Sequence, residues 1–446
     1  LFRININNVV KLLKGTIMRK LSFLSFIFIF FLNHLYAEDS QFFGIAGYRV
    51  GPYAAGGTPF FTGYIDYLKL LNERDGGLNK VKISWEECEF EYNTAKGLEC
   101  YERLKTKGKT GPTAIHPMST GVTYGLMDRA PKDEIPLITL GYGRTDATDG
   151  RVFPWVFPLV TNYWSQASAI IEFINQKAKD GIQGKKIVLL YHDSAYGKEP
   201  QNVIEQEAKK LKFELVKVPV PHPGNEQQSQ WLQIRKERPD WVILWGWGVM
   251  NATAIKTAQK VGFKRNKIVG NWWAGSEIDT LAAGGKVAKG YYAATLNLSG
   301  SDFNVVQDIK KYVYDKGKGG NEKYLGTVLW NRGVVAALVT VEGVKKAQSK
   351  YGNKVMTGAQ VRWGLENLSL SENDLKKLGF GDMVPPIKLS CENHEGAGLT
   401  RFQQWDGKQW TVASDWIGGD KKLVRDMIEK SAAQYAKEKN ITPKCL

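Results

Sequence analysis

A serine close to a histidine is the first feature of this chain that could do chemistry. Ser119 lies in Pro117-Met118-Ser119-Thr120-Gly121, three residues after His116. The nucleophilic serine of an α/β hydrolase sits in a G-x-S-x-G turn, and here Pro117 occupies the position of the first glycine. The chain also lacks the G-x-x-x-x-G-K-[ST] phosphate loop, a G-x-G-x-x-G turn after a strand and the H-E-x-x-H zinc motif. We therefore expect no catalytic residue, no metal ion and no cofactor, and predict that the protein is not an enzyme.

We expect Ser119 and Thr120 to bind a ligand rather than to react. They fall where a predicted strand ends and a predicted helix begins, so that their backbone N–H groups have no partner within the helix. These N–H groups and the two hydroxyl groups could hold an anion, typically a carboxylate. The alternative for Ser119 is an ordinary helix N-cap.

Other groups are predicted to reach the same pocket from neighbouring turns. Gly141-Tyr142-Gly143 follows the next strand and offers a second set of backbone donors, with a plain turn as its alternative. Tyr53 lies in the glycine-rich loop 51–63, where it could close the pocket or pack on the surface.

Three tryptophans leave predicted strands on the edge where a ligand would bind. Trp247 is flanked by Gly246 and Gly248, and such small neighbours would let its ring swing into a cleft. Trp272 and Trp273 end the next predicted strand, with packing in the core as the alternative for each.

The elements that must position these residues alternate between strands and helices. Short apolar runs bounded by turn residues predict buried parallel strands at Val81–Trp85, Ile135–Leu140, Ile187–Tyr191 and Trp241–Trp245. Apolar residues at helical spacing predict helices at Tyr163–Lys179, Pro200–Leu211 and Asn251–Val261. This alternation predicts doubly wound α/β sheets, which bind ligands at the carboxyl ends of their strands.

The C-terminal part of the chain has a different pattern. Two alternating runs on either side of Asp406-Gly407 predict a β-hairpin over Thr400–Val412. A closing helix is predicted over Lys421–Lys437.

The N-terminal residues predict export. Met18 is followed by Arg19 and Lys20, by an apolar run from Leu21 to Leu32, and by a small residue at Ala37. These are the parts of a cleavable signal peptide, and the apolar run is shorter than the roughly 20 residues of a membrane-spanning helix. We predict cleavage after Ala37, an upstream extension before Met18, and a periplasmic location.

Size and charge limit the function classes. Removal of residues 1–37 leaves about 409 residues, which predicts two domains. It also removes five positive charges and no negative ones, so that the formal net charge falls from +16 to +11. Because charges of both signs are interspersed, we expect no nucleic-acid partner.

The four cysteines are predicted to form disulfides, as is usual in an oxidising compartment. Four cysteines allow three pairings, and nearness in the sequence favours Cys88 with Cys100, which leaves Cys391 with Cys445. A zinc site at Cys391, His394 and Cys445 is the weaker alternative, because it has only one C-x-x-H spacing.

Several motifs together resemble the branched-chain amino acid-binding proteins of ABC importers. They are the loop Gly51–Gly63, the turn Asp75-Gly76-Gly77-Leu78-Asn79, Met118-Ser119-Thr120-Gly121, His192-Asp193 to Tyr196-Gly197, and the helix Thr253–Gly262. The resemblance covers nearly all of the chain after residue 37. It implies a type I periplasmic binding protein, an α/β fold of two doubly wound Rossmann-like lobes joined by a three-stranded hinge.

The resemblance also implies lobe boundaries and a further site residue. Lobe 1 would comprise residues 38–160 and 295–389, and lobe 2 residues 161–294 and 390–446, with hinge crossings near Val160, Thr295 and Leu389. Tyr196 matches the tyrosine that faces the ligand in the family, with packing against the following helix as its alternative. His394 lies near the third crossing, where we expect a satisfied hinge residue.

One departure from the family pattern bears on the ligand. An acidic residue holds the α-ammonium group in amino-acid-binding relatives, and the matching position here falls on Trp272 or Trp273. Either Glu277 or Asp193 replaces that acid, or the ligand has no amino group and the tryptophans hold an apolar or aromatic body, because an unpaired buried ammonium is costly.

We therefore predict a periplasmic substrate-binding protein of an ABC importer. It would capture a small organic solute, such as an amino acid, an amide or an aliphatic or aromatic carboxylate, by hinge closure, and deliver it as a monomer to an inner-membrane permease. The alternatives are a ligand-sensing receptor module for a membrane signalling partner, and a secreted hydrolase that uses Ser119.

Overall fold

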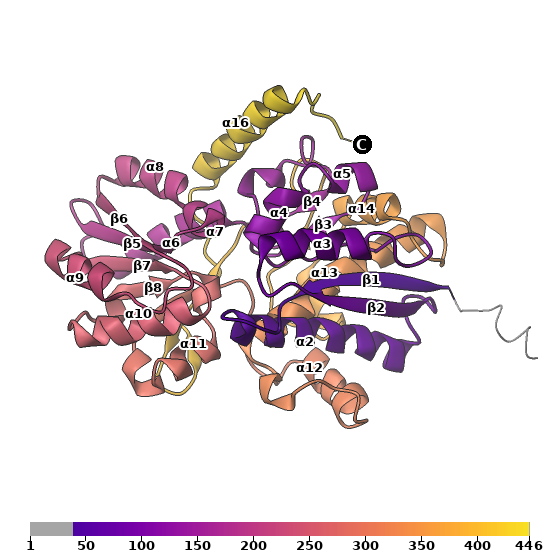
Figure 1. Ribbon diagram of the computed structural model, residues 1–446, viewed down its shortest axis with the longest axis horizontal. Coiled ribbons are helices and arrows are strands. Elements are labelled where there is room, and N and C mark those ends of the chain that lie inside the picture. Colours follow the sequence, from indigo (N-terminus) through magenta and orange to yellow (C-terminus); the bar gives the residue numbers. More distant parts are fainter. Residues whose placement is uncertain (1–38, 446) are drawn as a thin grey trace, which may run out of the picture. The chain divides into compact units, whose positions relative to one another are not determined.

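The computed structural model describes residues 39–445, and the fold below is that of the compact unit that begins at Gln41. The predicted signal peptide and its cleavage site after Ala37 lie outside the described residues. Two groups of strands, each with helices packed against it, make up the fold (Figure 1).

The larger sheet has seven strands in the order β13-β12-β9-β8-β7-β5-β6. Its strands are β5 (Lys186–His192), β6 (Glu214–Val220), β7 (Trp241–Trp245), β8 (Ile268–Gly270), β9 (Tyr292–Thr295), β12 (Arg401–Trp405) and β13 (Trp410–Val412). β5 to β9 are parallel, and the β12–β13 hairpin is added antiparallel to β9. The hairpin predicted around Asp406-Gly407 is therefore confirmed.

Side-chain alternation along β5 explains why helices cover both faces of this sheet. Ile187 and Leu189 are in the core cluster that also contains residues of α6 (Tyr163–Lys177) and α8 (Gln201–Leu211). Val188 and Leu190 are in the other cluster, with residues of α9 (Gln228–Glu237) and α10 (Val249–Lys260). The uninterrupted apolar run of β5 is thus buried on both faces, as a doubly wound sheet requires. The predicted strands at Ile187–Tyr191 and Trp241–Trp245 and the three predicted helices are confirmed.

The smaller group of strands precedes α6 in the chain. It comprises β1 (Ser40–Gly47), β2 (Lys82–Glu89), β3 (Leu137–Ile138) and β4 (Val156–Phe157). Ile115 forms parallel bridges with both Gly44 and Leu137, and so connects the β1–β2 pair to the parallel β3–β4 pair. The prediction of a buried strand at Val81–Trp85 was wrong in its burial. β2 pairs with β1 alone among the named strands, and most of its side chains are half-buried because it lies at an edge.

Two long helices pack closely beside these strands. α2 (Ala54–Leu70) and α13 (Val328–Tyr351) approach so closely that a Cβ atom on Gly63 would lie 2.0 Å from the Trp330 carbonyl oxygen. A Cβ atom on Gly333 would likewise lie 1.9 Å from the Phe60 carbonyl oxygen. The glycines therefore permit a backbone approach that any side chain would prevent.

The remaining elements are short, apart from the C-terminal helix α16. They are α3 (Thr94–Leu104), α4 (Thr120–Leu126), α5 (Ala130–Asp133), α7 (Ala195–Lys198), α11 (Glu277–Ala282), α12 (Asn304–Ile309), α14 (Gly358–Glu366), α15 (Glu372–Lys377), α16 (Lys421–Lys439), and the antiparallel strands β10 (Ser369–Leu370) and β11 (Ile387–Lys388). Disulfides join Cys88 to Cys100 and Cys391 to Cys445. The second of these ties the C-terminal tail to the segment after β11. It also excludes the alternative zinc site, because both cysteines are bonded to each other.

Candidate functional site

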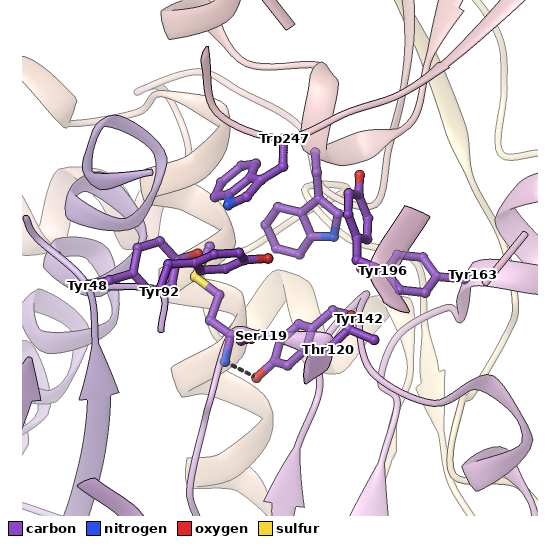
Figure 2. A pocket seen from close by; sticks show the side chains of 10 residues that line it. Tyr48, Tyr92, Ser119, Thr120, Tyr142, Tyr163, Tyr196 and Trp247 are labelled. Carbon is purple, nitrogen blue, oxygen red and sulfur yellow. Dashed lines mark hydrogen bonds between the residues drawn. The ribbon is translucent and has the colours of Figure 1, made fainter. Parts of the chain in front are cut away.

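A narrow aromatic pocket lies between segments that follow the strands of both groups (Figure 2). It is lined by Tyr48, Tyr92, Met118, Ser119, Thr120, Tyr142, Tyr163, Tyr196, Trp247 and Trp273. The lining contains no charged side chain, and the free volume is about 10 Å³. That volume admits about one water molecule, so a larger ligand requires the pocket to widen.

Ser119 combines the two functions that its sequence context allows. It is the N-cap of α4, and its Oγ accepts a hydrogen bond from the Val122 N–H at 3.3 Å, while the residue also lines the pocket. The backbone N–H groups of Ser119 and Thr120 have no hydrogen-bond partner among residues 39–445. The helix cap thus leaves backbone donors at the pocket.

The second predicted set of donors, at Gly141-Tyr142-Gly143, was wrong. The Gly141 N–H donates to the Leu159 carbonyl at 2.8 Å, and the Tyr142 N–H donates to the Thr139 carbonyl at 3.1 Å. The Gly143 N–H donates to Thr120 Oγ1 at 3.3 Å. All three groups are used to hold the turn, and none is left for a ligand.

Most of the pocket's polar side-chain groups are already paired. The Tyr142 hydroxyl accepts from the Met118 N–H at 2.8 Å and donates to the Ile138 carbonyl at 2.7 Å. The Tyr196 hydroxyl accepts from Asn271 Nδ2 at 2.7 Å and donates to the Gly246 carbonyl at 2.8 Å. These two residues therefore present ring faces, not free hydroxyl groups.

Tyr48 is different, because its hydroxyl is buried without a hydrogen-bond partner in residues 39–445. Its polar neighbour is the Trp247 indole. Burial raises the pKa of the Tyr48 hydroxyl well above its usual range, so it stays protonated and can donate. An unpaired buried hydroxyl costs about 1–3 kcal/mol, which a ligand acceptor would recover.

Two residues of the lining have left-handed backbones that only glycine adopts easily. Tyr92 has φ of +59° and Met118 has φ of +39°. The Tyr92 ring packs against Tyr48 and Tyr53, at centroid distances of 4.9 and 4.4 Å. Such backbone strain persists where the surrounding structure requires it, and it is concentrated at functional sites.

The three tryptophans lie together but have different roles. Trp247 and Trp273 line the pocket and pack edge to face, with ring centroids 5.3 Å apart. Trp272 is fully buried outside the lining, where it stacks on Tyr163 at 5.9 Å. The indole N–H groups of Trp272 and Trp273 both donate to the Gly141 carbonyl, at 2.7 and 2.8 Å. This shared acceptor fixes Trp273 against the turn from the other group of strands.

Neither acid that could replace the usual ammonium ligand reaches the pocket. Glu277 accepts hydrogen bonds from the Val328 N–H at 3.1 and 3.2 Å, at the start of α13. Asp193 is exposed and forms an ion pair with Lys198 at 2.8 Å. The lining therefore contains no carboxylate that could form an ion pair with an ammonium group.

A fully buried arginine supports the pocket from behind. Arg332, on α13, donates from Nη1 to the Trp272 carbonyl at 2.7 Å and from Nε to Asn297 Oδ1 at 2.9 Å. Its guanidinium lies 4.7 Å from the centre of the Trp273 ring, and its Nη2 has no partner among the described residues. Burial lowers the pKa of Arg332 to about 9, which leaves it charged at neutral pH.

A second, larger cavity of about 620 Å³ adjoins the aromatic pocket. Tyr92, Ser119 and Tyr196 line both. In this outer cavity the Tyr53 hydroxyl bonds His192 Nε2 at 2.8 Å and lies 3.5 Å from His222 Nδ1. Tyr53 is thus buried at the outer cavity and does not pack on the surface, the alternative that its sequence context allowed.

A family model described as periplasmic binding protein matches residues 40–409. The chain belongs to the periplasmic binding protein family. It is therefore a solute-binding protein with the type I periplasmic binding protein fold. Among residues 39–445, no helix is both long and apolar enough to cross a bilayer.

Solved structures agree with this assignment. A structure described as an ABC transporter permease from the Pseudomonas fluorescens group is 46% identical, with a TM-score of 0.85, and the match covers 92% of this binding protein and all of that chain. A branched-chain amino acid ABC transporter protein from Thermus thermophilus with bound valine is 20% identical, with a TM-score of 0.74 and coverage of 88% and 99%. A solute-binding protein from R. palustris in complex with benzoate is 19% identical, with a TM-score of 0.66 and coverage of 85% and 98%. Among curated proteins, none matches this chain.

The structure brings six of the predicted ligand-binding residues of this binding protein into one pocket. These are Ser119, Thr120, Tyr142, Tyr196, Trp247 and Trp273, whereas Tyr53, Gly141 and Trp272 lie outside the lining. Sequence reasoning missed Tyr48, Tyr92, Met118, Tyr163 and Arg332. The predicted hinge residue His394 is fully buried, stacks on Phe157 at 4.0 Å and shares a hydrogen bond with the Val156 carbonyl through Nδ1.

Glu277 provides a pH test of the packing behind the pocket. Burial raises the pKa of Glu277 from 4.5 to about 7, so the folded protein binds this proton more tightly than the unfolded chain. Its contribution to stability is fully present below pH 4.5 and is lost as the pH rises to about 7. Between these pH values the unfolding free energy of wild type should fall by on the order of 2 kcal/mol more than that of Glu277→Gln, because glutamine does not ionise. Urea unfolding at each pH measures the difference. The exposed Glu226→Gln is the control, and parallel profiles for Glu277→Gln and wild type would contradict the assignment.

Proposed function

We propose that this binding protein captures a small planar or aromatic solute that carries a carboxylate or amide group and no ammonium group. The observation that carries this proposal is a pocket of aromatic rings from both groups of strands, with no charged side chain in its lining. Unpartnered donors at Ser119, Thr120 and Tyr48 are available for the carboxylate or amide oxygens. Rings on both sides suit a flat apolar body, since burying an aromatic surface of 150–250 Å² contributes about 4–6 kcal/mol.

The solute would enter by separation of two lobes and would be held when they close. We take residues 38–160 with 295–389 as lobe 1, and 161–294 with 390–446 as lobe 2, with hinge crossings near Val160, Thr295 and Leu389. Contacts between these parts support a closed arrangement, because Thr145 Oγ1 donates to Glu199 Oε2 at 2.9 Å and Tyr53 bonds His192. A pocket of about 10 Å³ is too small for an organic solute, so binding is expected to shift an equilibrium between this closed form and a more open one.

Delivery completes the proposed function. We propose that the chain is exported by the signal peptide ending at Ala37, acts as a monomer in the periplasm, and presents the closed form to an inner-membrane ABC permease. The family assignment supports this context, and the two disulfides suit an oxidising compartment.

The experiment is a thermal-shift and calorimetry comparison of residues 38–446 with benzoate, benzamide, leucine and phenylalanine. We expect stabilisation by benzoate or benzamide, of about 2.7 kcal/mol at 100 times Kd, and none by the amino acids. Ser119→Ala should weaken binding without creating or abolishing any turnover, and Ser229→Ala, at an exposed position of α9, is the control. Stabilisation by the amino acids alone would overturn the proposal.

A further inference from the structure

The outer cavity adjoins the aromatic pocket, because Tyr92, Ser119 and Tyr196 line both. Their sizes differ greatly, at about 10 Å³ and about 620 Å³. Ligand pockets in proteins usually enclose about 300–1,000 Å³, a range that only the outer cavity reaches. Small ring movements could open the aromatic pocket for one flat group, while the room for the rest of a solute lies outside Ser119.

The two cavities also differ in chemistry. The aromatic pocket presents rings, whereas the outer cavity adds the side chains of Asn93, Ser194, His192 and His222. His192 and Ser194 bond each other at 2.8 Å, and Asn93 Oδ1 accepts from the Lys96 N–H at 3.1 Å. The Asn93 amide N–H groups and the His222 ring therefore supply the hydrogen bonds for a ligand here. A ligand that spans both cavities would therefore place an apolar ring inside and a hydrogen-bonding tail outside.

The outer cavity has little unpaired charge to select a charged tail. The Glu91 carboxylate forms an ion pair with Lys96 at 2.7 Å. His192 has partners on both ring nitrogens, Tyr53 through Nε2 and Ser194 through Nδ1, each at 2.8 Å. Burial lowers the pKa of His192 to about 4, so this ring is neutral at pH 7. A neutral tail is the best match for such a lining.

Ser119 lies where the two cavities meet and has an unpartnered backbone N–H there. A carbonyl group that joins ring and tail would lie beside this donor. We propose that the preferred solute is an N-substituted aromatic amide, with its ring in the aromatic pocket, its amide carbonyl beside Ser119, and a neutral polar substituent in the outer cavity. This inference rests on the proposed function, to which it adds the outer half of the ligand.

The test compares benzamide with N-(2-hydroxyethyl)benzamide by titration calorimetry, using the full chain after residue 37. We expect the hydroxyethyl group to increase affinity at least tenfold. Equal or weaker binding of the longer compound, with benzamide still bound, would overturn this inference and leave the proposed function intact. Failure of both amides and of benzoate to bind would overturn both.

Two variants assign any gain to the outer cavity. Ala95 is exposed and lines the outer cavity alone, so Ala95→Trp should remove the gain while leaving benzamide affinity unchanged. His222→Ala should also reduce the affinity gained from the hydroxyethyl group, by removing a hydrogen-bonding side chain instead of filling the cavity. Ala433→Trp, at an exposed position of α16, is the matched control. A full tenfold gain in both Ala95→Trp and His222→Ala would contradict the placement of the tail.

Discussion

Replacing Gly56 with alanine is expected to weaken solute binding at least tenfold without destabilising the unliganded protein. Gly56 lies in the first turn of α2, and the Trp247 ring packs directly on it. A Cβ atom at Gly56 would lie 2.3 Å from Trp247 Cη2 and 2.7 Å from its Cζ2, which is closer than such atoms can approach. Because Trp247 leaves β7 and α2 belongs to the proposed lobe 1, the clash acts against closure.

The effect on stability separates this clash from general damage. Alanine is favoured over glycine in a helix by about 1 kcal/mol, so the unfolding free energy of the open form should rise slightly. The closed form should be disfavoured by the clash. Calorimetry gives the affinity, and urea unfolding without ligand gives the stability. Ala55→Ser, at the exposed neighbouring position, is the control. Unchanged affinity in Gly56→Ala would show that Trp247 does not need this contact in the bound form.

The strands and helices were largely predictable because their apolar patterns are local. β5 and β7 are short apolar runs between turn residues, and burial on both faces of a parallel sheet produces that pattern. β2 was predicted less well, because the sequence of Lys82–Glu89 does not reveal that the strand lies at an edge. Edge position depends on which strands pair, and pairing is not a local property.

Among the residues of the site, Tyr196 was predicted from the family pattern. Ser119, Trp247 and Trp273 were predicted because they lie in turns after predicted strands, since loops at the carboxyl ends of strands carry the ligand site. Tyr48 follows β1 in the same manner and could have been found by the same rule. The Gly141–Gly143 turn resembled a set of free donors, but its N–H groups are satisfied by Leu159, Thr139 and Thr120. Hydrogen bonds between distant segments decide which donors remain free.

Arg332 was missed for a related reason. In the sequence it is one of four basic residues of α13, with Lys345, Lys346 and Lys350, and its residue type alone does not show that it is buried. Its partners are Trp272, 60 residues earlier, and Asn297, 35 residues earlier. Burying a guanidinium group is unfavourable unless it forms hydrogen bonds. The acceptors for Arg332 come from segments far away in the sequence, so they could not be identified before the fold was known.

Arg332→Met is expected to lower the unfolding free energy by about 3–5 kcal/mol and to weaken solute binding. Methionine would fill similar space but leave the buried Trp272 carbonyl and Asn297 Oδ1 without the donors that Arg332 provides. The change would also remove the cation that lies 4.7 Å from the Trp273 ring and lowers the pKa of the nearby Glu277 and Asp279. With its support lost, Trp273 should no longer hold one orientation at the pocket.

Arg362→Met is the matched control for this prediction, because it removes another buried arginine away from the pocket. The Arg362 guanidinium lies 5.1 Å from the Trp155 ring centre and 3.7 Å from Glu366, on α14. Both variants should lower the urea midpoint, but only Arg332→Met should reduce affinity for benzoate or benzamide in calorimetry at a temperature where both are folded. Equal affinities in the two variants would show that Arg332 stabilises the fold without positioning Trp273. The distinction is measurable because Arg332 bonds the residue that directly precedes Trp273, whereas Arg362 contacts no residue of the pocket lining.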